Sequence, residues 1–236
     1  MIAKFSKLKN KQETRSLITR IEPHSPITEQ YKTIRSNIQF ASVDKEIQSL
    51  MFTSATPGEG KSTTAANLAV VFAQQGKRVL LVDTDLRKPV MHHVFHLDNR
   101  MGLTYILTRN KTISESVHKT SEKNLHILTS GPIPPNPAEL LMSNAMVNFY
   151  NEAIQKYDLV IFDTPPLLAV TDAQVMANLC DGTIFVVSSE KVKADQVGRA
   201  KELLDAANAK ILGAVLNNKK VPKQNDYYYY YGENAR

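Results

Sequence analysis

The sequence predicts an α/β fold with a doubly wound, mainly parallel sheet, and three observations support this prediction. Short apolar runs occur without polar alternation, which is typical of strands buried on both faces of a parallel sheet. Amphipathic segments of helical length separate these runs. A glycine-rich loop joins the first run to a helix, as in folds that bind phosphate. The length of 236 residues fits one such domain with tails.

The expected strands and helices alternate along the chain. Six strands are expected, at residues 50–53, 79–82, 125–128, 159–162, 183–187 and 211–216. An amphipathic helix is expected to begin at Pro26 with Ser25 as its N-cap, because apolar residues recur after it at three- and four-residue spacing. Further helices are expected at residues 61–75, ended by Gly76, and at 137–156 and 193–207.

Composition divides the chain into three parts. Residues 1–24 form a basic arm that we expect to be flexible; its first 20 residues contain six lysines and arginines against one acid, Glu13. Such an arm is either a solvated tail or a contact for phosphate or acidic lipid headgroups. Residues 25–218 form the α/β domain, and residues 219–236 form a tyrosine-rich tail. Because the domain itself is close to neutral, binding to nucleic acid is not favoured.

The single cysteine, Cys180, lies in an apolar stretch and is expected in the core. One cysteine excludes a disulfide within the chain and any zinc or iron–sulfur site built on cysteines. No apolar run reaches the roughly 18 residues that span a bilayer, and the basic start lacks the apolar core of a signal peptide. We therefore expect a cytoplasmic protein that reaches a membrane only through a partner or its basic arm.

The segment ATPGEGKST, residues 55–63, predicts a P-loop that binds ATP with Mg²⁺. It lies between an expected strand and an expected helix, and it matches GxxxxGK[ST] except that Ala55 replaces the first glycine. The two remaining glycines allow successive backbone amides to turn toward phosphate oxygens, and the helix N-terminus adds a partial positive charge. Lys61 is expected to bridge the β- and γ-phosphates, and Ser62 to offer its hydroxyl to the metal.

Three aspartates follow two of the expected strands. Asp83 and Asp85 come after residues 79–82, and Asp163 comes after residues 159–162. In a doubly wound sheet the carboxyl ends of neighbouring strands meet at one edge, where ligands bind. Aspartates at such places can instead cap the following helices. Three acids beside a P-loop favour a magnesium site, because Mg²⁺ prefers oxygen ligands.

At this point the sequence resembles a known family. The segments DTDLRKP (83–89), PNPAELL (135–141) and DTPP (163–166), in this order after the P-loop, are similar to the deviant Walker ATPases that include the Min/Par positioning proteins. Within that group the chain resembles the bacterial tyrosine kinases of exopolysaccharide and capsule systems, in their short, Firmicutes-like form. The likeness extends from about Pro26 to the C-terminus and includes the tyrosine cluster. It implies a P-loop NTPase fold.

The main alternative is a Min/Par-like switch ATPase without protein kinase activity. Those proteins carry a signature lysine near the start of the P-loop, and the aligned position here is Thr56. The iron–sulfur scaffold members of the superfamily need Cys-x-x-Cys, which is absent. A nucleotide-dependent scaffold with negligible turnover is a third hypothesis. The missing lysine and the run of tyrosines favour the kinase.

The resemblance implies a non-receptor protein-tyrosine kinase that transfers the γ-phosphoryl group of ATP to tyrosine. It implies autophosphorylation in trans and phosphorylation of other proteins, with control of exopolysaccharide or capsule production. The expected acceptors are Tyr227, Tyr228, Tyr229, Tyr230 and Tyr231. The expected nucleotide contacts are Thr56, Pro57, Gly58, Glu59, Gly60, Lys61, Ser62 and Thr63, with Asn217 as a candidate for base recognition.

The expected catalytic residues are Lys61, Asp83, Asp85 and Asp163, and the expected metal ligands are Ser62, Asp85 and Asp163. A tyrosine hydroxyl has a pKa near 10, so a base would help the transfer. Asp83 is the first candidate for that base and Asp85 the alternative. Arg87 and Lys88 either orient phosphate or an acidic substrate, or are surface charges.

Partners are also implied by the resemblance. Short kinases of this family act with a transmembrane modulator whose cytoplasmic end activates them, which would recruit the chain to the inner face of the membrane. They form homo-oligomeric rings, in which a Glu-x-x-Arg-x-x-Arg motif contacts the neighbour. Here the motif is Glu29, Lys32 and Arg35, and the lysine replaces a bidentate arginine. Tyrosine-containing protein substrates and a phosphotyrosine phosphatase complete the expected partners.

Overall fold

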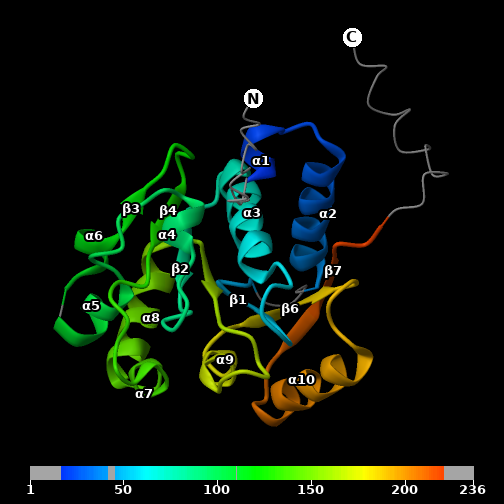
Figure 1. Ribbon diagram of the computed structural model, residues 1–236. Coiled ribbons are helices and arrows are strands. Elements are labelled where there is room, and N and C mark those ends of the chain that lie inside the picture. Colours follow the sequence, from blue (N-terminus) through cyan, green and yellow to red (C-terminus); the bar gives the residue numbers. More distant parts are fainter. Residues whose placement is uncertain (1–16, 42–45, 110, 221–236) are drawn as a thin grey trace, which may run out of the picture.

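The protein, described by a computed structural model over residues 17–41, 46–109 and 111–220, contains a seven-stranded sheet (Figure 1). The strand order is β3-β4-β2-β5-β1-β6-β7. All neighbouring strands are parallel except β3 and β4. The strands are β1 (Ser49–Ser54), β2 (Val79–Asp83), β3 (His118–Lys119), β4 (Leu125–Leu128), β5 (Leu159–Asp163), β6 (Gly182–Ser188) and β7 (Ile211–Asn217). This confirms the predicted doubly wound α/β fold and its six strands; β3 was missed because two residues carry no pattern.

One face of the sheet is covered by four helices from the N-terminal half of the chain, with α3 among them (Figure 1). They are α1 (Ile18–Ile21), α2 (Pro26–Phe40), α3 (Lys61–Gln74) and α4 (Met91–Val94). Their apolar side chains pack on Leu50 and Phe52 of β1 and on matching residues of β2 and β5. Ser25 caps α2 by accepting a hydrogen bond from the Thr28 amide, as the sequence predicts.

The remaining helices cover the opposite face. They are α5 (Leu103–Arg109), α6 (Ile113–Ser116), α7 (Pro137–Leu141), α8 (Asn144–Lys156), α9 (Asp172–Ala177) and α10 (Ala194–Ala206). Alternate residues of the same strands, such as Met51 of β1 and Phe162 of β5, point into this second core. Because both faces are covered, β1, β2 and β5 are buried along their whole length. Cys180 is buried in this second core, as predicted.

Two predicted boundaries differ from the structure. The single helix expected over residues 137–156 is divided into α7 and α8, because Ser143 caps a new helix by accepting from the Met146 amide. The flexible arm was expected to extend to residue 24, yet Leu17 and Thr19 are buried. The backbone amide and hydroxyl of Thr19 both donate to Asn67 Oδ1 on α3, at 3.1 and 2.9 Å. The packed domain therefore begins by residue 17.

The rest of the basic arm and the five tyrosines of the tail lie outside the described residues. Helices with the length and apolar character needed to cross a bilayer do not occur in residues 17–41, 46–109 or 111–220.

Candidate active site

The P-loop lies between the end of β1 and the start of α3, as the sequence predicts. Gly58 and Gly60 have φ angles of 82° and 92°, in the left-handed region that favours glycine. Pro57 and Gly58 are exposed at the tip of the loop, whereas Lys61 and Ser62 are buried at its base. The loop thus presents an open tip and a closed floor to a ligand.

Glu59 holds this loop in shape from inside. Its side chain is fully buried, and Oε1 accepts hydrogen bonds from the backbone amide and the hydroxyl of Thr56, at 2.6 and 2.9 Å. Its Oε2 accepts from the backbone amide of Ser188 at the end of β6, at 3.0 Å. We predicted Glu59 and Thr56 as nucleotide contacts, but these side-chain bonds are made within the protein.

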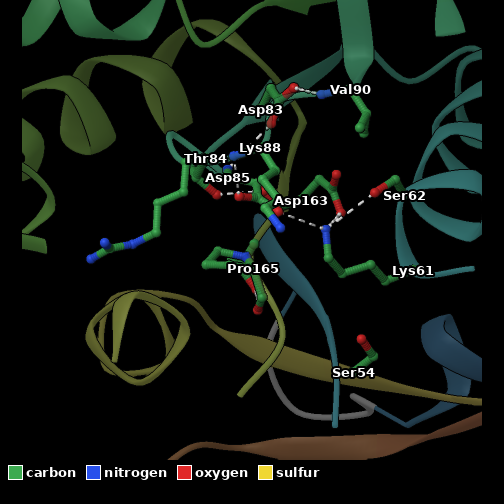
Figure 2. A network of polar contacts seen from close by, with 12 residues as sticks. Ser54, Lys61, Ser62, Asp83, Thr84, Asp85, Lys88, Val90, Asp163 and Pro165 are labelled. Carbon is green, nitrogen blue, oxygen red and sulfur yellow. Dashed lines mark hydrogen bonds and ion pairs between the residues drawn. The ribbon is translucent and has the colours of Figure 1, made fainter. Parts of the chain in front are cut away.

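The three predicted carboxylates meet at the ends of β2 and β5. Asp83 and Asp163 are register partners on these neighbouring strands. Lys61 Nζ lies 3.2 Å from Asp163 Oδ1, 3.4 Å from Asp85 Oδ2 and 3.2 Å from the Ser62 hydroxyl (Figure 2). The structure therefore brings together the P-loop lysine, the serine and all three acids that the sequence singled out.

Burial and mutual repulsion set the charge state of this cluster. Burial, together with the charge of Asp163, raises the pKa of Asp83 to about 7, although the backbone amides of Met91 and Val90 and the ammonium of Lys61 oppose the shift. Burial likewise raises the pKa of Asp163, although the ammonium of Lys61 opposes the shift. For Lys61 burial alone would lower the pKa, but the charges of Asp163, Asp85 and Asp83 outweigh it and raise it. Lys61 is therefore a cation held among acids.

Asp83 and Asp85 have different surroundings. Asp83 is fully buried, and its oxygens accept from the backbone amides of Asp85, Val90 and Met91 at 2.8–3.2 Å. It therefore holds the segment after β2 in place. Asp85 accepts from the Lys88 amide with one oxygen and faces Lys61 with the other. For direct contact with an incoming hydroxyl the geometry favours Asp85, whereas the raised pKa favours Asp83 as a base.

A metal ion would have ligands at this edge of the sheet. Asp163 Oδ2 is a buried oxygen that has no hydrogen-bond partner among the described residues. The hydroxyl of Ser62 lies near the same carboxylate and lowers the pKa of Asp163. No group of three or more acidic, histidine or cysteine side chains in the described part of the chain is arranged to enclose a metal. These donors suit Mg²⁺, which is held by few protein ligands together with waters and phosphate oxygens.

The ends of β6 and β7 contact the loop from the other side of β1. Asn217 Nδ2 donates to the Glu59 carbonyl oxygen at 2.9 Å, and a Cβ on Gly60 would lie 2.1 Å from this nitrogen. Lys191 Nζ donates to the Gly58 carbonyl oxygen at 3.0 Å. Asn217, the last residue of β7, was predicted from the resemblance to related ATPases. Lys191 and Ser188 were missed, because no motif marks them and only the fold brings them to the loop.

Arg87 forms a structural ion pair. Its guanidinium contacts both oxygens of the buried Asp172, at the start of α9, at 3.0 Å each. Lys88 is exposed. The guanidinium of Arg87 joins the segment after β2 to α9, a contact that the sequence did not predict.

The predicted oligomer-contact residues on α2 also make contacts within the chain. Glu29 and Lys32 form an ion pair with each other at 2.7 Å on the surface. Arg35 turns inward and donates to the Val71 carbonyl oxygen of α3 at 2.9 Å. Glu29 is exposed, whereas Lys32 and Arg35 are both half-buried.

Comparisons with known proteins show the family of the chain. The AAA domain family model matches residues 50–208. The chain is 56% identical over 216 residues to the tyrosine-protein kinase YwqD of Bacillus subtilis (strain 168), covering 92% of this chain and 91% of that one. It is 43% identical over 225 residues to the putative tyrosine-protein kinase CapB of Staphylococcus aureus, covering 95% and 99%.

The crystal structure of the chimerical protein CapA2B2 superimposes with a TM-score of 0.84 at 47% identity, covering 87% of this chain and 90% of that one. This chain belongs to the bacterial tyrosine kinase family. The family membership favours the kinase over the switch ATPase that the sequence left as its main alternative. It also agrees with Thr56 in place of the signature lysine.

Proposed function

We propose that the chain is an ATP-dependent protein-tyrosine kinase that phosphorylates its own C-terminal tyrosines in trans and tyrosines of other proteins. The observation that carries the proposal is the contact of Lys61 with Asp85, Asp163 and Ser62 at the end of β5. A P-loop lysine among carboxylates at strand ends is suited to hold a triphosphate and its metal at one point.

ATP and Mg²⁺ are the proposed cofactors. The exposed amides of the loop tip and the N-terminus of α3 would hold the phosphates, and Lys61 would bridge the β- and γ-phosphates. Ser62, Asp85 and Asp163 would hold Mg²⁺ directly or through waters, and the ion would neutralise charge that develops on the transferred group. The unpartnered oxygen of Asp163 supports this assignment.

The reaction would be an in-line transfer of the γ-phosphoryl group to a tyrosine hydroxyl. Positioning and charge neutralisation supply most of the catalysis in such transfers. Asp83 and Asp85 are the two candidates for the group that takes the hydroxyl proton. Asp83 has the pKa of a base that works near neutral pH, and Asp85 has the more accessible position.

The proposed acceptors are Tyr227, Tyr228, Tyr229, Tyr230 and Tyr231. They follow β7 after a short connection, and terminal segments of this kind can reach a neighbouring active site. A homo-oligomeric ring with Glu29, Lys32 and Arg35 at its contacts would provide that neighbour. A transmembrane modulator would activate the kinase and recruit it from the cytoplasm to the inner face of the membrane, and a phosphotyrosine phosphatase would reverse the modification. The regulated process would be exopolysaccharide or capsule production.

The test is to incubate the full chain with ATP, Mg²⁺ and the cytoplasmic end of the modulator, and to map phosphotyrosine by mass spectrometry. We expect the modification within residues 227–231, and none after replacement of all five tyrosines by phenylalanine. The variant K61M serves as the inactive control. Release of phosphate without phosphotyrosine would overturn the kinase proposal and favour a switch ATPase. Tight nucleotide binding with unchanged ATP would favour a scaffold.

A further inference from the structure

Lys191, in the turn between β6 and α10, contacts the tip of the P-loop. Its Nζ donates to the Gly58 carbonyl oxygen at 3.0 Å, and a Cβ placed on Gly58 would lie 3.1 Å from this nitrogen. The residue is exposed, and no ion pair with a carboxylate is formed by it within the described residues, whereas its neighbour Glu190 pairs with Lys220 at 3.0 Å. The alkyl stem of Lys191 therefore stays available on the surface while its ammonium rests on the loop.

The turn that carries Lys191 is itself fixed to the loop. The Ser188 amide donates to Glu59 Oε2, and the Ser188 carbonyl oxygen accepts from the Lys191 amide at 3.3 Å. The next residue, Ser189, donates its amide to the Asn217 carbonyl oxygen at 2.9 Å. The ends of β6 and β7 and the P-loop thus form one hydrogen-bonded unit, which holds Lys191 beside Asn217.

The strand order assigns this unit to one end of the nucleotide. Asp83 and Asp163 are the last residues of β2 and β5, on one side of β1, and Lys61 points toward this end of the two strands (Figure 2). That side is where the γ-phosphate and the metal would bind. β6 and β7 lie on the other side of β1. If the γ-phosphate of a nucleotide lies at the carboxylates and the rest of the nucleotide extends across the loop, its ribose and base would lie over Lys191 and Asn217.

We propose that Lys191 is a nucleoside-binding residue: its ammonium holds the P-loop tip at Gly58 while its alkyl stem forms a wall against the ribose and base. Lysine is suited to this, because its stem packs on apolar surface while its charged end stays hydrogen-bonded. The inference rests on the proposed ATP site and adds the residue that would hold the nucleoside half of the ligand.

The experiment compares two probes that share phosphates but differ in the nucleoside. Isothermal titration calorimetry with Mg²⁺ measures binding of ADP and of inorganic tripolyphosphate to the full chain and to its variants K191A and K191R. We expect K191A to bind ADP about tenfold more weakly, and tripolyphosphate less than threefold more weakly. K191R, which keeps a long stem and a cation, is expected to stay within threefold of the parent for both probes. K201A, at an exposed lysine of α10, is the matched control.

Each outcome decides the inference. Equal weakening of both probes in K191A would mean that Lys191 acts on the phosphates, and unchanged ADP binding would mean that it does not contact the nucleoside; either result overturns the proposal. Thermal unfolding of the variants separates binding from folding, and K191R, which preserves the contact with Gly58, covers the case in which K191A unfolds. If the parent protein binds neither ADP nor ATP, the proposed function itself fails instead.

Discussion

The P-loop follows β1, and the groups on its two sides differ in kind. On the β2 and β5 side, three buried carboxylates surround the ammonium of Lys61. On the β6 and β7 side, the contacts are hydrogen bonds to the loop from Ser188, Lys191 and Asn217. Buried charges of one sign repel unless a cation lies among them, whereas hydrogen-bonded amides hold a shape without that repulsion. The first side is suited to chemistry and the second to fixing the loop.

The largest effect is expected from K61M, which removes the cation of the charged side. Phosphoryl transfer should fall at least about a hundredfold, because removal of one strong electrostatic group at a reacting centre costs about this much. Phosphotyrosine measured by mass spectrometry, with K201M as the surface control, checks it. Transfer at a tenth of the parent rate or more would show that Lys61 is not essential.

E59Q is expected to affect both protein stability and nucleotide binding, because Glu59 holds the P-loop in shape and joins it to β6. A glutamine keeps one acceptor oxygen but turns an NH₂ group toward a backbone donor, so one buried hydrogen bond is lost. We expect the free energy of unfolding to fall by about 1–3 kcal/mol and ADP binding to weaken about tenfold. Denaturant unfolding and calorimetry measure these effects. If the free energy of unfolding and the ADP affinity of E59Q both equal those of the parent, the loop keeps its shape without the carboxylate.

D83N tests the electrostatics of the charged side through pH. The pKa of Asp83 is raised from 3.8 to about 7 in the folded protein, so the folded state retains a proton that the unfolded chain loses. The contribution of Asp83 to the free energy of unfolding is therefore fully present below about pH 4 and is lost as the pH rises to about 7, by up to about 1.4 kcal/mol per pH unit for one proton. Above that window both states are ionised and the slope ends.

Denaturant unfolding, measured across this pH range in the presence of a chelator, should show that the free energy of unfolding falls with rising pH in the parent and falls less in D83N. Because Asp83 and Asp163 interact, the slope belongs to the pair, and D163N is the companion variant. Phosphorylation assays on D83N and D85N then separate the candidate bases. The variant that lacks the catalytic base should lose phosphoryl transfer while it still binds ADP. An unchanged pH slope in D83N would contradict the buried, protonated carboxyl.

N217A is expected to give the smallest effect, on the hydrogen-bonded side. It removes one neutral hydrogen bond to the Glu59 carbonyl and the proposed contact with the base. ADP should bind about fivefold more weakly, in line with about 1 kcal/mol for such a bond. Calorimetry with ADP and GDP measures both affinity and base preference, with N178A on the exposed end of α9 as control. Unchanged affinity and preference would place the base elsewhere.

The charged side was largely predictable from sequence. The P-loop pattern fixes Lys61 and Ser62 at a strand–helix junction, and aspartates that end apolar strands must meet at the carboxyl edge of a parallel sheet. The division of residues 137–156 into two helices was not predicted, since Ser143 acts through one local hydrogen bond. The packing of Leu17 and Thr19 was also missed, because Thr19 is held by Asn67, which is 48 positions away in the sequence.

The sequence by itself determined the fold class, the P-loop, the three aspartates and the resemblance to a kinase family, because these depend on local patterns and on fixed spacing. Only the tertiary structure decided that Arg87 pairs with Asp172, that Glu59 holds the loop, and that Lys191 reaches Gly58. These contacts join residues on different elements, and their partners carry no shared pattern in the sequence. The loop that binds phosphate can be read from nine consecutive residues; the groups that hold it in place come from β6 and β7, more than a hundred residues away.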